Sequence, residues 1–300
     1  MFSFRKITLE DRDAVNERLA ASDLRGCEYS FANNNAWQRL SGLEICLTGD
    51  FYICRCFNDG VMSFIFPAGA RTDGEGREKY LSLFSELKKY SEGQGQPLVI
   101  SSVRESDLEW LKEYYGDRLS VSLNRDDSDY IYRAEDLIEL KGKKYHGKRN
   151  HIRHFVSQPW SFEPISKDNL EPCILFAAEL YNKEKDYYGS AAIEQFAIDF
   201  FLMNMDRLDL KGGVLRSCGR VVGFSIGEKL NSDTFVVHIE KADSSVQGAY
   251  PMLMNQFAAA YAGSCTYINR EEDMGIEGLR KSKESYHPAF MLDKYTVTIK

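Results

Sequence analysis

Basic side chains are concentrated in the segment 140–155, L-K-G-K-K-Y-H-G-K-R-N-H-I-R-H-F. Six Lys or Arg residues and three of the chain's five His residues lie between Lys141 and His154, and no acidic residue lies between Glu139 and Glu163. The chain as a whole has a net charge of −7. A cationic segment within an anionic chain indicates a local site for an anionic group such as phosphate, and a solvated connecting helix is the alternative.

A helical reading divides this segment into two faces. One face is apolar and contains Tyr145, Ile152, Phe155 and Val156. Lys148 and Arg149 border that face, so we predict that these two residues bind the phosphate groups of a substrate. Lys143 and His154 lie on the opposite side and are predicted to face solvent.

A second candidate is the turn that contains Gln247, Gly248, Ala249 and Tyr250. It follows a predicted strand, Thr234–Glu240, and opens a predicted apolar helix, Gln247–Tyr261. Free N–H groups at the start of a helix bind phosphate or polarise an acyl carbonyl oxygen. We therefore predict that this turn contacts the donor substrate, and an ordinary strand-to-helix turn is the alternative.

A third candidate is the segment Tyr267–Tyr286, which passes from a strand through an acidic loop into a helix. Asn269, Arg270, Glu272 and Asp273 are expected at the carboxyl end of the strand, where α/β proteins place their sites. Asn269, Glu272 and Asp273 are predicted to be catalytic. Arg280 and Lys283 follow on the helix and are predicted to bind phosphate. A capped helix start followed by an exposed basic turn is the alternative.

Glu240 stands at another strand end and is a further candidate for the base. His238 lies two residues earlier, within the apolar run V-V-H-I. A histidine in such a strand is more often a hydrogen-bonded core residue than a catalyst. Glu240 and Glu272 thus remain as alternative bases.

Several chemistries are not indicated. The chain has no Gly-x-Ser-x-Gly elbow, no P-loop and no Rossmann fingerprint. Its seven cysteines include no Cys-x-x-Cys pair, so we predict no metal site and read them as buried thiols in a reducing compartment. The negative net charge makes broad nucleic-acid binding the least favoured class. With no apolar leader and no apolar window of membrane-spanning length, the expected location is cytoplasmic, without a transmembrane segment.

The elements expected to position these residues occur in the same order twice. In the first half we predict helices at Thr8–Ser22, Arg77–Tyr90 and Asp107–Tyr115, a loop at Glu28–Gly42, and strands at Leu43–Leu47, Phe51–Phe57, Val61–Phe66, Pro97–Val103, Leu119–Leu123 and Asp129–Tyr132. In the second half we predict helices at Glu171–Lys185, Ala191–Asp206, Gln247–Tyr261 and Gly275–Ser285, and strands at Ser161–Pro164, Gly213–Ser217, Val221–Glu228, Thr234–Glu240, Cys265–Asn269 and Tyr295–Ile299. This repetition predicts an α/β (α+β) protein of two similar units, residues 1–135 and 136–300.

Three segments together resemble a known family. They are residues 129–155, the Gln-Gly-Ala-Tyr turn, and Y-I-N-R-E-E-D-M-G-I-E-G-L-R-K-S-K-x-S-Y-x-P from Tyr267. The chain resembles a bacterial family of uncharacterised proteins that is similar to the C-terminal catalytic domain of phosphatidylglycerol lysyltransferase and, more distantly, to the Fem peptidyl transferases. The resemblance implies two GNAT-like (N-acetyltransferase-like) units in tandem, each a mixed sheet flanked by helices, with the active site in the C-terminal unit. Its Lys-Arg-Asn run adds Asn150 as a lesser phosphate ligand.

The resemblance also implies acyl or aminoacyl transfer, with acyl-CoA or aminoacyl-tRNA as the donor and a small molecule or lipid as a candidate acceptor. Such a transfer needs oxyanion donors, a base and cations for the donor phosphates. Gln247-Gly248-Ala249 is a compressed form of the acetyltransferase pyrophosphate signature. The alternative is a binding module without activity that holds tRNA, a nucleotide or an anionic lipid on the central basic helix.

Overall fold

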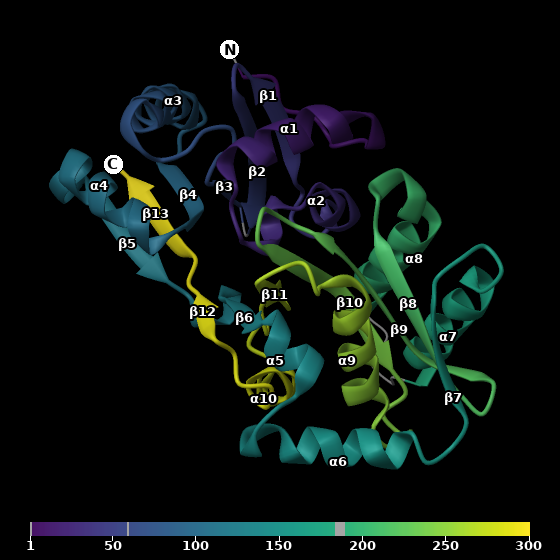
Figure 1. The fold of residues 1–300 in the computed structure, drawn as a ribbon. Helices are drawn as coiled ribbons and strands as arrows, with labels where there is room; N and C mark the ends of the chain where they lie inside the picture. The colour runs from purple at the N-terminus through teal and green to yellow at the C-terminus, as the bar shows by residue number, and fades with distance from the viewer. Residues whose placement is uncertain (1, 59, 184–189) are drawn as a thin grey trace. The chain divides into compact units, whose positions relative to one another are not determined.

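The computed structural model describes residues 2–58, 60–183 and 190–300, which form two mixed sheets with helices around them (Figure 1). The strands of the first sheet are β1 (Glu44–Thr48), β2 (Phe51–Asn58), β3 (Val61–Ile65), β4 (Leu98–Val103), β13 (Tyr295–Ile299) and β5 (Leu119–Leu123), in that spatial order. The strands of the second sheet are β7 (Trp160–Pro164), β8 (Lys211–Ser217), β9 (Arg220–Lys229), β10 (Thr234–Ala242), β11 (Tyr267–Asn269), β6 (Asp129–Arg133) and β12 (Phe290–Leu292).

The helices follow the predicted pattern with additions. In the first half they are α1 (Arg12–Ser22), α2 (Phe31–Trp37), α3 (Gly74–Gly93), α4 (Glu105–Tyr115) and α5 (Ala134–Glu139). In the second half they are α6 (His146–Phe155), α7 (Leu170–Lys183), α8 (Ser190–Leu208), α9 (Ala249–Tyr261) and α10 (Glu277–Glu284). Of the helix predicted at Glu171–Lys185, residues 184 and 185 lie outside the described residues. Among the described helices, none combines the length and the apolar character that crossing a membrane requires.

Both sheets have one plan. An antiparallel meander (β1–β3, or β8–β10) is followed by a helix (α3 or α9) and a strand that pairs in parallel with the last strand of the meander. The next strand in each sheet comes from a distant part of the chain. In the first sheet β13 lies between β4 and β5, and in the second sheet β6 lies between β11 and β12. The two halves of the chain therefore exchange one strand each.

This exchange changes the division of the chain. The first compact unit contains Met1–Asp129, Glu272–Gly275 and Met291–Lys300, and the second contains Tyr130–Glu271 and Ile276–Phe290. These units differ from the contiguous ranges 1–135 and 136–300 that the sequence suggested. A strand is assigned by the neighbours it pairs with, and the order of elements along a chain does not reveal an exchange of strands.

The core of the first unit was largely predictable. Helix α3 buries Tyr80, Leu83, Phe84 and Leu87, which are the apolar stripe of the predicted helix Arg77–Tyr90. Trp110 of α4 stacks on Phe84 at a centroid distance of 6.4 Å, and β13 adds Val297 to the same cluster. Burial of these large side chains is the main stabilising contribution to such a unit.

The predicted loop at Glu28–Gly42 is wrong, because residues 31–37 form α2. Ser30 caps this helix by accepting a hydrogen bond from the N–H of Asn33 at 2.9 Å. Asn34 donates to the carbonyl of Glu28 at 2.9 Å and to the hydroxyl of Tyr52 at 3.1 Å. Asn lowers helix propensity because it competes for backbone groups, but here capping and tertiary hydrogen bonds offset that cost.

The basic segment forms a short turn at Lys143–Tyr145 followed by α6. Tyr145 and Phe155 are buried and Ile152 is partly buried, as the helical reading predicted. Val156, which was predicted on the apolar face, is 41% exposed and follows the last residue of the helix, Phe155. The other correction concerns thiols: Cys218 is exposed in the turn between β8 and β9, while the other six cysteines are buried thiols.

Candidate functional site

Strands β10 and β11 separate partway along the second sheet. Their parallel pairing covers Thr234–Val236 of β10 and ends at Asn269 of β11. Beyond that point β10 continues to Ala242 beside β9, with a register shift between Val237 and Ile239. Residues that follow the last pair on either strand therefore lie at the carboxyl ends of two diverging parallel strands, where α/β folds commonly bind ligands.

Arg270 and Glu240 meet at this separation. Nη2 of Arg270 lies 2.9 Å from Oε2 of Glu240, and the two side chains are only 8% and 10% exposed. The guanidinium also lies over two aromatic rings, at 4.7 Å from the ring centroid of Tyr286 and 5.5 Å from that of Tyr132. Nη1 of Arg270 has no hydrogen-bond partner in the described part of the chain. A buried, charged donor without a partner is costly, and such groups are concentrated at functional sites.

Lys148 of α6 approaches the same ring. Its Nζ lies 3.6 Å from the ring centroid of Tyr286 and donates a hydrogen bond to Oγ of Ser285 at 2.7 Å. Partial burial and the positive charge of Arg270 lower the pKa of Lys148 to about 8, against an opposing effect of Glu240. Lys148 therefore carries a proton that it can release or regain near neutral pH.

We refer to Lys148, Glu240, Arg270 and Tyr286 as the Arg270 site. It holds two cationic groups and one carboxylate, so it has an excess of positive charge. The hydroxyl of Tyr286 is buried and has no hydrogen-bond partner among the described residues, and burial raises the pKa of Tyr286. An anionic group, or an oxygen that becomes negative during a reaction, would complete this arrangement.

Two other predicted phosphate ligands are bound to the backbone. Arg149 donates to the carbonyl oxygens of Leu140 and Gly142, and thereby closes the C-terminal end of α5. Lys283 is buried, and its Nζ donates to the carbonyl of Arg270 at 2.6 Å, which holds that residue in place. Arg280 is half-buried on α10 and Asn150 is exposed on α6.

Helix α6 packs against the turn that was predicted to bind the donor. Gly248 has a φ of +86°, and a Cβ there would lie 2.3 Å from the carbonyl oxygen of His151. The N–H of Ala249 is bonded to the carbonyl of Val246 at 3.1 Å, and Pro251 has no N–H. Gln247 and Tyr250 are exposed. Gly248 therefore allows close approach of a helix, and few backbone donors remain at this end of α9 for a pyrophosphate.

The predicted catalytic residues Asn269, Glu272 and Asp273 do not form one group. The amide oxygen of Asn269 accepts a hydrogen bond from the N–H of Glu271 at 2.7 Å. Asp273 is buried in the first unit, where it pairs with Arg125 at 2.5 Å and accepts from the N–H of Gly275 at 2.9 Å. These hydrogen bonds stabilise the backbone.

Glu272 belongs to a cluster in the first unit that the sequence did not reveal. Lys294 lies 2.6 Å from Asp129 and 2.9 Å from Glu28, and its Nζ lies 3.3 Å from Sγ of Cys27. Ligand atoms of Cys27, Asp129 and Glu272 all lie within 4.8 Å of one another, a spacing that suits a metal ion. The ammonium of Lys294 already supplies positive charge to them, and these carboxylates raise the pKa of Lys294 although burial lowers it.

His238 is a hydrogen-bonded core residue, as the sequence favoured. Its Nδ1 lies 2.9 Å from Glu271, its Nε2 lies 3.0 Å from Glu228, and its ring stacks on Phe201. Burial lowers the pKa of His238, but the hydrogen bonds to the two carboxylates outweigh burial and raise it to about 9. The imidazolium is therefore part of a structural ion triad.

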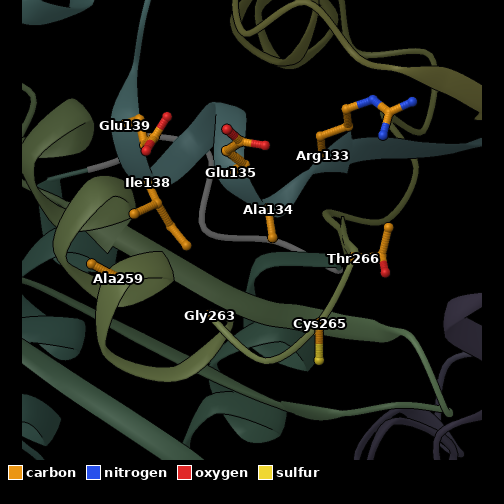
Figure 2. A pocket seen from close by; sticks show the side chains of 9 residues that line it. All are labelled: Arg133, Ala134, Glu135, Ile138, Glu139, Ala259, Gly263, Cys265 and Thr266. Carbon is orange, nitrogen blue, oxygen red and sulfur yellow. The ribbon is translucent and has the colours of Figure 1, made fainter.

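A cavity of about 470 Å³ also lies in the second unit (Figure 2). Its lining comes from α5 and its preceding residue, and from the C-terminal part of α9 and the connection that follows: Arg133, Ala134, Glu135, Ile138, Glu139, Ala259, Gly263, Cys265 and Thr266. None of the residues predicted for catalysis or phosphate binding lines it. The Arg270 site and this cavity thus have no residue in common.

Besides the signals that selected Lys148 and Glu240, the sequence contained a signal for Arg270 itself. Arg270 directly follows β11, and a charged residue after an apolar strand points to the sheet edge. Tyr286 carried no such signal, because an isolated Tyr after a helix is ordinary. Its role is visible only when the chain folds back over β11.

Residues 19–298 match the sequence profile of the family described as phosphatidylglycerol lysyltransferase, C-terminal. An uncharacterized protein of Mycoplasmoides gallisepticum is 23% identical over 207 residues, which are 68% of this chain and 66% of that protein. A conserved protein of unknown function from Bacteroides thetaiotaomicron is 34% identical, with a TM-score of 0.92 and full coverage of both chains.

More distant structures share the fold. L-PGS from Bacillus licheniformis is 14% identical, with a TM-score of 0.65 over 97% of this chain and 92% of that chain. FemX is 9% identical, with a TM-score of 0.64 over 99% and 97%. A tandem GNAT protein from the clavulanic acid biosynthesis pathway is 8% identical, with a TM-score of 0.50 over 99% and 98%. The predicted fold of two GNAT-like units, each a mixed sheet flanked by helices, is confirmed.

Proposed function

The chain belongs to the family of the C-terminal domain of phosphatidylglycerol lysyltransferase, and on this premise we propose that it is an aminoacyltransferase whose reaction occurs at the Arg270 site. The donor would be an aminoacyl-tRNA, and the acceptor would carry a hydroxyl or amine. The observation that carries the proposal is that Nη1 of Arg270, near Lys148, has no hydrogen-bond partner among the described residues.

The proposed step is a direct displacement at the ester carbonyl of the donor. The acceptor oxygen or nitrogen forms a bond to the acyl carbon, and the bond from that carbon to the tRNA ribose oxygen breaks. Nη1 of Arg270 stabilises the negative charge that develops on the carbonyl oxygen. The proton lost by the acceptor ends on the ribose oxygen, and Lys148, with a pKa of about 8, is suited to relay it.

Glu240 then has a different role from the base that the sequence suggested. It binds Nη2 of Arg270 and so turns Nη1 toward the reacting group. We assign Glu240 as a positioning residue. Glu272, the other candidate base, lies in the cluster around Lys294 and is not part of the proposed step.

Two observations favour tRNA over acyl-CoA as the donor. The turn before α9 retains few free N–H groups for a pyrophosphate, because Ala249 is hydrogen-bonded and residue 251 is proline. Lys143, in the turn before α6, and Arg153 and His154, on α6, are exposed and suit the repeated phosphates of an RNA backbone.

The proposal is tested with tRNA charged with radioactive amino acids and incubated with the protein and a bacterial extract. Label should move from tRNA into an organic-soluble or small-molecule product faster than it is lost by spontaneous hydrolysis. Acetyl-CoA with labelled acetyl groups serves as the competing donor. Transfer from acetyl-CoA alone would overturn the tRNA assignment, and binding of charged tRNA without turnover would instead support a binding module.

A further inference from the structure

Of the four sheet edges in the described part of the chain, three are protected against pairing with another strand. At β1, Arg5 forms two backbone hydrogen bonds with Ile45, of 2.7 and 3.0 Å. β7 is bounded by Pro159 and Pro164, and proline cannot donate a backbone hydrogen bond. β12 has only three residues. Short strands, proline and covered edges are the usual ways in which proteins prevent edge-to-edge association.

The fourth edge, β5, has none of these features. Its sequence is L-S-V-S-L, without proline, glycine or charge, and in the described part of the chain it pairs with β13 alone. Val121 is 38% exposed and Leu123 is 44% exposed. An uncharged edge strand with exposed apolar side chains is a template for a further strand.

The sequence of β5 is also its own complement. In an antiparallel pair of two copies centred on Val121, that residue lies opposite itself, Ser120 lies opposite Ser122, and Leu119 lies opposite Leu123. Each apolar residue then meets an apolar residue on the same face, and each serine meets a serine. Such a two-fold arrangement is the commonest symmetry of protein dimers.

We propose that β5 pairs with β5 of a second copy of this chain, so that two first-unit sheets join into one continuous sheet. Helix α4 extends the contact on the apolar face, because it packs against β5 and its Tyr114 is 54% exposed. A ladder of five residues is smaller than a standard protein interface, so the dimer forms weakly and depends on concentration.

The test introduces a charge at Val121, the residue that would lie opposite its own copy in the dimer. Wild type is followed by sedimentation equilibrium from micromolar to millimolar concentration, where its mass should rise toward twice 34.4 kDa. Val121→Lys and Val121→Glu should each remain monomeric, because like charges would lie opposite each other. An equimolar mixture of the two variants should dimerise again. A monomeric wild type, or a mixture that stays monomeric, would overturn the proposal.

Val61→Lys is the matched control. Val61 is 49% exposed in the same unit, but its strand β3 lies between β2 and β4. This variant should dimerise like wild type, and its loss of the dimer would count against β5 as the interface. If a Val121 variant fails to fold by circular dichroism, amide exchange of wild type decides instead. Exchange in Leu119–Leu123 should slow at high concentration, and unchanged exchange there would reject the pairing.

Discussion

Glu240 binds one side of the Arg270 guanidinium, with Oε2 2.9 Å from Nη2, while Nη1 on the other side has no partner among the described residues. Removing either residue should therefore have different consequences. Loss of Arg270 removes the donor itself, whereas loss of the Glu240 charge leaves the donor present but less firmly held. A comparison of the two losses therefore distinguishes a site in which Arg270 stabilises a negatively charged oxygen from one in which Glu240 acts as a base.

Arg270→Lys should lower the rate of single-turnover aminoacyl transfer by about 10²–10³, the usual effect of removing one oxyanion donor. Glu240→Gln should lower it less, because the amide oxygen still accepts from Nη2. The control is Arg153→Ala on the exposed face of α6. This variant should weaken tRNA binding, but at saturating tRNA its single-turnover rate should equal that of wild type. A larger loss for Glu240→Gln than for Arg270→Lys would return Glu240 to the role of base.

The pKa of Lys148 should respond in opposite directions to changes at its two charged neighbours. Arg270 lowers this pKa and Glu240 raises it, so Arg270→Gln should raise the pKa from about 8 and Glu240→Gln should lower it. Both shifts are measured by NMR titration of methylated lysines, with Lys148→Arg to assign the signal. Shifts in the same direction would show that altered packing, and not charge, governs this lysine.

His238 should make folding stability depend on pH. Its pKa is about 6.5 when unfolded and about 9 when folded, so its contribution is complete below pH 6.5 and is lost as pH rises through 9. The difference in unfolding free energy between wild type and His238→Gln should thus fall by on the order of 3 kcal/mol over that window. Denaturant titrations of the two proteins across this pH window measure the difference. A difference that is constant with pH would contradict a buried imidazolium.

Gly248→Ala should destabilise the protein by about 2–4 kcal/mol, because a Cβ there would meet the carbonyl of His151 and a positive φ is strained for alanine. Gly147→Ala is the matched control on α6, where a Cβ would meet nothing within 4 Å. It should be neutral or stabilise by up to about 1 kcal/mol. The two variants are compared by urea titration. Equal midpoints would show that α6 does not pack closely against Gly248.

The sequence predicted most elements because their signals are local. Apolar stripes such as Tyr80, Leu83, Phe84 and Leu87 mark a helix regardless of what lies next to it. Helix α2 was missed because its stability comes from side-chain hydrogen bonds, including that of Asn34 to Tyr52, which no local pattern reveals. The exchange of β6 and β13 was missed for the same reason, since pairing partners are distant in sequence.

The sequence selected two residues of the candidate site, Lys148 as a phosphate ligand and Glu240 as a base. These two residues were selected from a helical face and a strand end, and the structure places both beside Arg270. Arg149 and Lys283 have the same charge as Lys148, yet their side chains hold backbone carbonyls. Which cation stays available to a ligand depends on the carbonyl groups within its reach, and residue type and spacing do not determine this.

The position of β13 has a consequence for how the protein is made. Its five residues lie between β4 and β5, yet they are synthesised after every other strand of both sheets. Until the residues of β13 have been synthesised, β4 and β5 have no strand between them, and the sheet of the first unit is open at this point. The second unit takes its exchanged strand, β6, from residues translated earlier, and its late strand β12 lies at the sheet edge. The half of the protein that is synthesised first therefore receives an interior strand of its sheet after all other strands have been made.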